Sequence, residues 1–258
     1  MVQSNSTDLR KDQLVFRRLD RPTTYGTLAE YTIAGPDIAV VPEGVDATSA
    51  AAVGTAGITA YQCLRIGGLR PGSKVFINGG SGGAGTWGIQ LARAMGFEVT
   101  TSCSTRNINL CRIFGANQII DYTNEDLIGT LKSKGHYYDL VVDNVGEPSN
   151  LYKEADHFLK PGCPFVQIGV AKSAYGFCNV LGRKGLPSAL GNGSRPWVYH
   201  HAKSQRADLE QIGQWLAEKK IKAVVDSEFS WEDAPQAYGR FKTGKAQGRV
   251  IVHVEASD

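Results

Sequence analysis

From residue 74 onward, short apolar runs alternate with longer stretches in which apolar residues recur every three or four positions. The short runs predict β-strands, because buried parallel strands are brief and almost continuously apolar. The longer stretches have the spacing of amphipathic helices. The expected strands are 75–77, 99–103, 118–120, 140–143 and 165–168, and the expected helices are 85–95, 106–114, 125–132, 149–159 and 207–218.

Strands and helices in regular alternation predict a parallel sheet covered by helices on both faces. Right-handed crossovers between such strands give an α/β fold with a doubly wound, Rossmann-like parallel sheet. Residues 175–203 break the pattern, with five glycines, two prolines and the basic-aromatic end Arg195-Pro196-Trp197-Val198-Tyr199. We expect a long loop here. It is either a surface loop with a buried tryptophan or a loop bordering the mouth of a substrate site.

A glycine-rich turn stands between the first expected strand and its helix. Residues 78–85 read Asn-Gly-Gly-Ser-Gly-Gly-Ala-Gly. A turn of this kind presents backbone N–H groups and the positive end of a helix to a pyrophosphate, which a Cβ atom would obstruct. We therefore predict that the turn binds a dinucleotide. The residues expected to hold the pyrophosphate are Gly80, Ser81, Gly82, Gly83, Ala84 and Gly85.

The same turn also fits the Gly-x-Ser-x-Gly pattern of a hydrolase nucleophile elbow, with Ser81 as the nucleophile. A triad would then need Asp143 and one histidine among His157, His200 and His201. However, the turn continues into Gly85, and no glycine cluster suited to an oxyanion loop precedes it. The hydrolase is therefore the less favoured of the two interpretations.

The second expected strand runs into Ser102-Cys103-Ser104-Thr105-Arg106, which offers hydroxyls and a cation but no acid. NAD-binding domains hold the ribose hydroxyls with an acidic residue at this point, whereas hydroxyls and a cation suit a 2′-phosphate. The predicted cofactor is therefore NADPH, with Ser104, Arg106 and Tyr122 around the adenosine phosphate. The carboxyl ends of the fourth and fifth strands should border the nicotinamide half, through Asn144, Val145, Gly146, Ile168 and Gly169.

The composition is that of a globular protein with a substantial core: 258 residues, of which 42% are hydrophobic and 21% charged. The net charge of +3 is evenly spread, so no nucleic-acid partner is expected. No apolar run approaches the roughly twenty residues of a membrane span, and residues 1–15 do not resemble a secretion signal. We expect a cytoplasmic protein with no membrane partner. The five cysteines have the spacing of free thiols, and no metal ligand set is visible.

Taken together, these motifs resemble the medium-chain dehydrogenase/reductase superfamily, and within it the zinc-free quinone oxidoreductase (zeta-crystallin-like) branch with its fungal and mitochondrial relatives. Residues 26–31 are similar to the family's Gly-x-x-Ala-Glu-Tyr strand, and residues 41–45 and 57–61 also match. Residues 244–252 are similar to the strand that returns to the catalytic domain. The resemblance covers about residues 26 to 254.

The resemblance implies an N-terminal GroES-like barrel of about a hundred residues, a domain-sized unit, yet only about 25 residues precede Gly26. We therefore expect a remnant of the barrel-type catalytic domain at 1–46, a dinucleotide-binding domain at 47–222, and a return segment at 223–258 that packs with the remnant. No catalytic zinc is expected. Apolar surface left by the barrel would be covered by a rebuilt N-terminal segment, a homodimer contact or a bulky apolar substrate.

The activity implied is that of an NADPH-dependent oxidoreductase, similar to quinone and enone reductases, acting on an activated alkene or carbonyl in a small apolar molecule. Thr59 and Tyr61 are catalytic candidates by resemblance, because either hydroxyl would polarise a substrate carbonyl. Helix packing explains both residues equally well. The missing barrel leaves two alternatives: a non-redox enzyme of secondary metabolism that cyclises or isomerises an apolar metabolite, and a non-catalytic partner of a full-length reductase.

Overall fold

The computed structural model describes residues 9–20, 26–169 and 194–254, and it divides the chain into two units. One unit combines Met1–Thr59 with Ala202–Asp258, and the other is Ala60–His201. Residues 47–59 and 202–222 therefore lie in the first unit, whereas the sequence analysis placed them in the dinucleotide-binding domain. The reason lies in local packing, because helix α7 (Arg206–Ala217) packs on the short strand β2 (Ala39–Val40).

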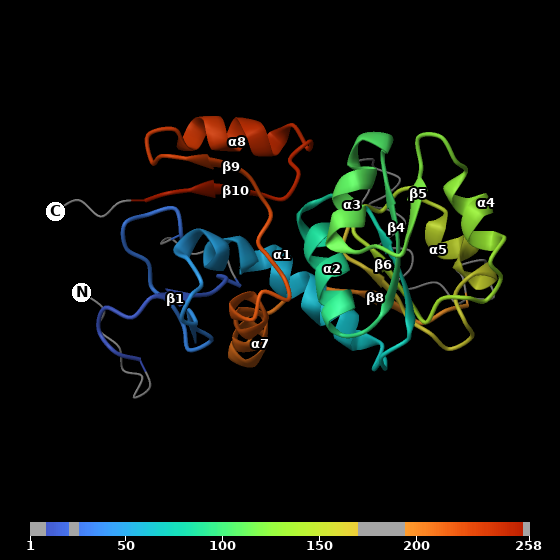
Figure 1. Ribbon diagram of the computed structural model, residues 1–258, viewed down its shortest axis with the longest axis horizontal. Helices are drawn as coiled ribbons and strands as arrows, with labels where there is room; N and C mark the ends of the chain where they lie inside the picture. The colour runs from blue at the N-terminus through green and yellow to red at the C-terminus, as the bar shows by residue number, and fades with distance from the viewer. Residues whose placement is uncertain (1–8, 21–25, 170–193, 255–258) are drawn as a thin grey trace. The chain divides into compact units, whose positions relative to one another are not determined.

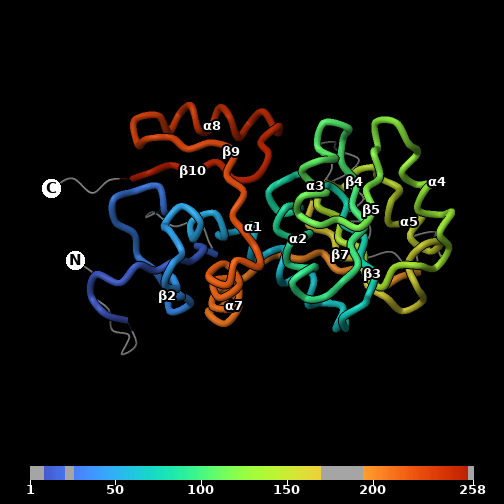
Figure 2. The backbone as a smooth tube through the Cα atoms, in the orientation of Figure 1, coloured from blue at the N-terminus to red at the C-terminus, as the bar shows by residue number. Residues whose placement is uncertain are grey.

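Unit 60–201 is built on a six-stranded parallel sheet. Its strands are β3 (Lys74–Asn78), β4 (Glu98–Cys103), β5 (Gln118–Asp121), β6 (Leu140–Asp143), β7 (Phe165–Gln167) and β8 (Trp197–Tyr199). Their order is β5-β4-β3-β6-β7-β8, so the chain winds outward from β3 and then returns to the other side of β3. The path of the backbone through this unit can be followed in Figure 2. The doubly wound parallel sheet is confirmed, and ligands bind such sheets where the winding reverses.

Helices cover both faces of this sheet, with α2 and α3 on one side of the strands and α4 and α5 on the other (Figure 1). The helical segments are α2 (Gly83–Ala94), the 3₁₀ turn η1 (Thr105–Asn107), α3 (Ile108–Phe114), α4 (Leu127–Lys132), α5 (Leu151–Glu154) and the 3₁₀ turn η2 (Ala155–His157). Each of these segments either has bounds within two residues of those of an expected helix or forms part of an expected helix. Local chemistry sets their limits: Asp126 accepts the N–H of Ile128 at the start of α4, and Gly115 ends α3 with a φ of 96°.

The core of this unit lies under α4 and α5. Phe76 on β3 packs on Tyr138 with ring centroids 5.7 Å apart, and Tyr138 meets Phe158 edge-on at 6.4 Å. These three rings and Phe165 are completely buried. Complete burial of an aliphatic or aromatic side chain of this size contributes roughly 1.5–3 kcal/mol, so this cluster fixes the inner strands that carry the site.

Strand β8 corrects the sequence analysis, which expected residues 197–199 to belong to a loop. Trp197 pairs with Phe165 in parallel register, and the Trp197 indole N–H donates to the Gln167 side chain at 3.1 Å. A strand of only three residues, directly after Pro196, is too short to show the alternation of apolar and polar positions that would predict it. Most of the remainder of the expected loop (175–193) lies outside the described residues.

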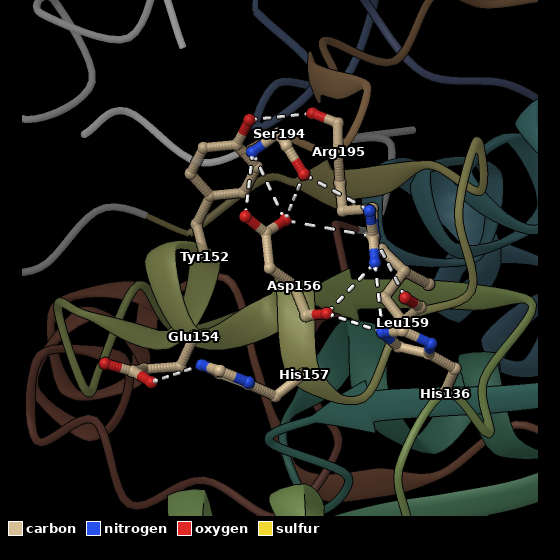
Figure 3. A network of polar contacts seen from close by, with 8 residues as sticks. All are labelled: His136, Tyr152, Glu154, Asp156, His157, Leu159, Ser194 and Arg195. Atoms are coloured by element: carbon tan, nitrogen blue, oxygen red, sulfur yellow. Dashed lines mark hydrogen bonds and ion pairs between the residues drawn. The ribbon is translucent and has the colours of Figure 1, made fainter. Parts of the chain in front are cut away.

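A polar network fixes the beginning of β8 (Figure 3). The Asp156 carboxylate accepts from the hydroxyl of Ser194 at 2.8 Å, and Tyr152 donates its hydroxyl to the Arg195 carbonyl at 2.7 Å. The Arg195 guanidinium donates to the backbone carbonyls of Leu159 at 2.9 Å and Asp156 at 3.0 Å. Side-chain contacts therefore tie the beginning of β8 to α5 and η2, in addition to the pairing of β8 with β7.

The described part of the first unit contains two small two-stranded sheets. β1 (Val15–Phe16) runs antiparallel to β2, and β9 (Val225–Phe229) runs parallel to β10 (Arg249–Val252), with α8 (Ala234–Lys242) between them in sequence. β10 lies within the segment 244–252 that resembles the family's return strand. Arg240 on α8 donates to both carboxylate oxygens of Asp226 on β9, at 2.7 and 2.6 Å.

Residues 26–31, which resemble a strand of the family, do not form one in this structure. A strand needs a hydrogen-bonded neighbour, and within the described ranges none pairs with this segment. Tyr31 remains 65% exposed as a result. Among the helices that the structure describes, none is both long and apolar enough to cross a bilayer.

Candidate functional site

A cavity of about 1090 Å³ lies in unit 60–201 and is lined by residues at the carboxyl ends of β3, β4 and β6. The structure brings eight of the predicted cofactor residues into its lining: Ser81, Gly82, Gly83, Ala84, Gly85, Tyr122, Asn144 and Val145. The other predicted residues are not part of the lining: Gly80, Ser104, Arg106, Gly146, Ile168 and Gly169. The cavity also extends to residues of α4 and α5 that the sequence analysis did not single out, including Leu127, Lys132 and Glu154.

The glycines of the turn between β3 and α2 meet different needs. Gly79 has a φ of +80°, which side-chain-bearing residues rarely adopt. A Cβ at Gly80 would lie 2.1 Å from Thr101 Oγ1, and one at Gly85 would lie 2.1 Å from the Gly79 carbonyl oxygen. At Gly82, by contrast, nothing lies closer than 3.8 Å. Gly79, Gly80 and Gly85 therefore allow the turn to fold, and Gly82 leaves the backbone open to the cavity.

The beginning of α2 is suited to an anion. The first turn of a helix leaves its N–H groups without intrahelical partners. Gly82, the cap residue, has no side chain to accept them, and no acidic residue stands in the first turn. The N-terminal end of a helix also carries a partial positive charge. The residues present therefore fit the pyrophosphate of a dinucleotide, which would occupy the side of the cavity that Gly82 leaves open.

A chain of hydrogen bonds ties the glycine turn to three neighbouring strands. Ser102 on β4 accepts the N–H of Gly79 at 2.9 Å and donates its hydroxyl to Asn78 Oδ1 at 2.6 Å. Asn78 on β3 donates in turn to the Asp143 carboxylate on β6 at 2.8 Å. The same Asp143 oxygen accepts the N–H groups of Val145 and Gly146, at 3.0 and 2.9 Å. The strand ends that line the cavity are therefore fixed to one another by buried polar contacts.

An acid does stand beside the loop that follows β4, although the run 102–106 itself contains none. Asp121, at the end of β5, accepts from the hydroxyl of Thr105 at 2.6 Å and the amide of Asn124 at 2.8 Å on one oxygen. Its other oxygen accepts the N–H of Thr123 at 3.1 Å. Hydrogen bonds from Thr105, Thr123 and Asn124 lower the pKa of Asp121 to about 2. With both oxygens already occupied, this carboxylate is engaged in holding the loop rather than open to a ribose.

The loop after β4 leaves its cation free. Arg106 is exposed, and the described residues offer it no ion pair or hydrogen bond. Ser104 is half-buried beside it. Asn107 closes the loop and is only 5% exposed, and its side-chain amide donates to Ser81 Oγ at 2.9 Å and to Ser104 Oγ at 3.2 Å. The sequence analysis did not identify Asn107, because nothing in the run Ser-Thr-Arg-Asn distinguishes it from an exposed polar residue.

Among the residues that the structure describes, these contacts leave no Ser-His-Asp triad. Ser81 is bonded to Asn107 rather than to a histidine, and Asp143 is bonded to Asn78 and to the backbone. His157 Nε2 lies 3.7 Å from Glu154 Oε2, and His200 Nε2 lies 3.1 Å from Gln62 Oε1. The hydrolase interpretation is therefore not supported by the geometry around the turn.

The residues that follow β7 pack closely against the loop after β6. The N–H groups of Ile168 and Gly169 both donate to the Asp143 carbonyl, at 3.0 and 3.1 Å. A Cβ at Gly169 would lie 2.4 Å from the backbone of Asn144. Glycine at this position allows the two loops to approach closely. Contact of these residues with a nicotinamide stays a prediction.

Thr59 and Tyr61, the catalytic candidates, both lie on α1 (Ala47–Ile66) and are each 8% exposed. The hydroxyl of Thr59 donates to the Thr55 carbonyl one turn earlier, at 2.6 Å. Neither residue belongs to the cavity lining. Their catalytic role stays a prediction.

The described cysteines are free thiols, namely Cys63, Cys103, Cys111 and Cys163. Burial raises the pKa of Cys63 to about 12. Cys103 lines the cavity, and a hydrogen bond from the Cys111 thiol lowers its pKa. In the part of the chain that the structure describes, no three His, Cys, Asp or Glu side chains gather as a metal site would require. The absence of zinc stays a prediction.

Comparison with known proteins shows which family this chain is similar to. A family model described as zinc-binding dehydrogenase matches residues 114–252. The trans-enoyl reductase pgmF of Aspergillus terreus is 48% identical over 256 residues, covering 96% of this chain and 71% of that protein. A mitochondrial NAD(P)H oxidoreductase of Mus musculus is 29% identical over 252 residues, covering 90% of this chain and 62% of that protein.

A solved structure shows the same arrangement of elements. The quinone oxidoreductase from Coxiella burnetii is 27% identical with a TM-score of 0.70, over 86% of this chain and 66% of that chain. This chain therefore spans between 62% and 71% of the length of the three proteins compared.

Proposed function

This chain belongs to the medium-chain dehydrogenase/reductase superfamily, in its zinc-free quinone oxidoreductase-like branch, and from that membership we propose that it is an NADPH-dependent reductase of activated alkenes or carbonyls in small apolar molecules. The family named in the sequence analysis is thus confirmed. An oxidoreductase that uses a nicotinamide cofactor agrees with the names of its relatives. The preference for NADPH and the kind of substrate are the proposed part.

One observation carries the proposal: the uncapped, acid-free start of α2 at Gly82 opens into a cavity large enough for much of a dinucleotide. The bound cofactor would supply a hydride. The protein would bind and orient it, since hydride transfer needs close positioning and a site without water more than it needs acid–base groups.

Each part of the site has a proposed task. The turn from Gly80 to Gly85 holds the pyrophosphate, and Ser104, Arg106 and Tyr122 hold the adenosine phosphate. The nicotinamide half lies along Asn144, Val145 and Gly146 and along Ile168 and Gly169. The Asp143 carboxylate keeps Val145 and Gly146 in place. A hydroxyl of Thr59 or Tyr61 would polarise the substrate carbonyl, which for Thr59 requires its hydroxyl to release the Thr55 carbonyl.

The substrate class follows from the relative of highest identity reported above, a protein named trans-enoyl reductase. We propose a carbon–carbon double bond conjugated to a carbonyl. Its reduction adds a hydride to the β-carbon and a proton, from water or a hydroxyl, to the α-carbon. Conjugation makes the β-carbon electron-poor, which is what a hydride acceptor requires.

The proposal is tested by titrating the purified chain with NADPH and with NADH, followed by calorimetry. We expect micromolar binding of NADPH. Arg106→Ala should weaken it roughly tenfold, because charge-assisted hydrogen bonds to phosphate are the strong ones, and should leave NADH binding unchanged. Arg112→Ala removes the same charge six residues further on, outside the proposed contact, and serves as the matched control.

Two other outcomes would redirect the assignment. If neither nucleotide binds at millimolar concentration, the reductase proposal is wrong. Conversion of an apolar metabolite without NADPH would then indicate the non-redox alternative, and co-purification with a full-length reductase the binding alternative. With NADPH bound, loss of its absorbance on adding an enone measures the reaction directly.

A homodimer and a cytoplasmic location also belong to the proposal. A homodimer would cover apolar surface on the first unit, where Tyr31 and Ile33 are 65% and 73% exposed. Sedimentation of the purified chain tests the first, and fractionation of cells tests the second. The mouse relative is a mitochondrial protein, so recovery of the chain with mitochondria would contradict the cytoplasmic location.

A further inference from the structure

Asn107 lies between the glycine turn and the loop after β4. Its backbone N–H donates to the Ser104 carbonyl at 2.8 Å, which closes η1. Its side-chain amide donates to Ser81 Oγ at 2.9 Å and to Ser104 Oγ at 3.2 Å. Ser81 belongs to the turn expected to hold the pyrophosphate, and Ser104 to the loop expected to hold the adenosine phosphate. A single buried amide therefore links the two phosphate-binding parts of the site.

The direction of these hydrogen bonds decides what the serines can do. The amide nitrogen of asparagine only donates, so each serine oxygen here is an acceptor. A hydroxyl that accepts at its oxygen must direct its own hydrogen elsewhere. The described residues provide no second partner for the hydroxyl of Ser81 or of Ser104. Both hydroxyl hydrogens are consequently available to an anion, and Ser81 lines the cavity.

We propose that Asn107 is a positioning residue of the cofactor site, which makes Ser81 and Ser104 donate to the pyrophosphate and to the adenosine phosphate respectively. The inference rests on the proposed function, since it needs a bound dinucleotide. It also separates two cofactors. NADH carries a pyrophosphate but no adenosine 2′-phosphate, so only the contact through Ser81 acts on NADH, whereas both contacts act on NADPH.

The first test reverses the polarity of the amide. Asn107→Asp places a carboxylate where both serine hydroxyls would donate to it instead of to the cofactor. We expect at least about a tenfold loss in NADPH affinity and a smaller loss for NADH, since hydrogen bonds to charged groups are the strong ones. Asn109→Asp adds the same charge two residues further along, at an exposed position, and should change either affinity less than threefold.

The second test separates positioning from general damage to the fold. Asn107→Ala and Ser81→Ala are combined in a double-mutant cycle, with NADH as the ligand and calorimetry as the readout. If Asn107 acts through Ser81, each single variant weakens NADH similarly, and the double variant is no worse than either. Ser104→Ala should weaken NADPH and leave NADH unchanged. Thermal unfolding of each variant shows that the folded state is retained.

The outcomes are distinguishable. Failure of the wild-type chain to bind either nucleotide overturns the proposed function and this inference with it. Wild-type binding that Asn107→Asp and Asn107→Ala leave unchanged overturns the inference alone. Additive losses in the cycle also overturn it, because they would mean that Asn107 affects binding independently of Ser81.

Discussion

At the scale of single residues, the glycines of the turn serve two different requirements, which are folding of the turn and approach of a ligand to its backbone. A glycine motif in the sequence does not distinguish them. Gly85 is needed by the fold, because its Cα faces the Gly79 carbonyl with no space for a Cβ. Gly82 is not needed by the fold, since its φ of −77° and its open surroundings would accept alanine. The remaining reason for a glycine at position 82 is the close approach of a ligand to the backbone.

This distinction predicts different results for two substitutions of the same kind. Gly82→Ala should leave the thermal midpoint unchanged and weaken NADPH binding at least about tenfold, through a methyl group placed where phosphate approaches. Gly85→Ala should lower the thermal midpoint as well, because overpacking typically costs about 1–3 kcal/mol. Scanning calorimetry and titration of both variants check this. Equal thermal effects would contradict the assignment.

Sequence reasoning found the residues that carry a recognisable chemistry and missed those that act through their neighbours. Residues 81–85, Tyr122 and Asn144, which line the cavity, were expected at the site because glycines and strand ends have a positional meaning. Asp121 and Asn107 were missed, because their importance comes from contacts with Thr105, Ser81 and Ser104. Their partners lie up to 26 positions away in the chain, and no periodicity relates positions that far apart.

At the scale of elements, an ion pair between Arg240 and Asp226 joins α8 to β9. Asp226 on β9 accepts from Arg240 Nε and Nη2, and from the backbone N–H of Gln247 at 2.8 Å. Hydrogen bonds from Arg240 are the main cause that lowers the pKa of Asp226 to about 2. The Asp226 side chain is only 7% exposed, so the pair is poorly screened by solvent.

The lowered pKa of Asp226 predicts how stability depends on pH. An unfolded Asp has a pKa of about 3.9, so the contribution of Asp226 is complete above about pH 5 and is lost as the pH falls through about 2. Asp226→Asn should reduce the free energy of unfolding by roughly 1.5–3 kcal/mol at neutral pH and remove this part of the acid dependence. Urea unfolding at pH 7 and pH 2.5 measures both.

The exposed Glu232, which has no ion pair among the described residues, provides the control for that measurement. Glu232→Gln should leave stability and its acid dependence nearly unchanged, because exposed charges contribute little. If both substitutions have the same effect, the Asp226–Arg240 pair does not hold this part of the first unit.

Helices and strands were predictable from the sequence where they are long or where strands alternate regularly with helices, as they do from β3 to α5. The two-residue strands β1 and β2 are too short for a pattern to appear, and β8 follows a proline. Residues 26–31 show the opposite error. Their sequence resembles a strand, but strand formation depends on a neighbour that the local sequence cannot supply.

At the scale of the whole molecule, the described chain consists of two units of different character. Unit 60–201 holds the sheet and the candidate site, whereas the first unit contains short strand pairs and more exposed apolar side chains, including Tyr238 and Phe241. Cofactor binding should therefore stabilise the molecule through unit 60–201.

Hydrogen exchange with and without NADPH locates that stabilisation. At a hundred times its dissociation constant, a ligand stabilises the folded state by about 2.7 kcal/mol. We expect the strongest added protection in peptides covering 78–85, 103–107 and 144–146, where the cofactor contacts are proposed. Peptides at 194–197, held by the network in Figure 3, should change least among those of the same unit. Protection that is uniform across unit 60–201 would contradict this location of the site.

The hydrogen-bonded chain from Ser102 through Asn78 to Asp143 has a consequence for how this sequence can diverge. Replacing any one of the three by an apolar residue leaves a buried donor or acceptor without its partner, which costs about 1–3 kcal/mol. Replacing them together removes the donors and acceptors at once and costs less than the separate losses would suggest. Evolutionary drift at these strand ends is therefore constrained to coordinated steps. We therefore expect substitutions at the ends of β3, β4 and β6 to occur together, although Asn78, Ser102 and Asp143 lie 24 and 41 positions apart in the chain.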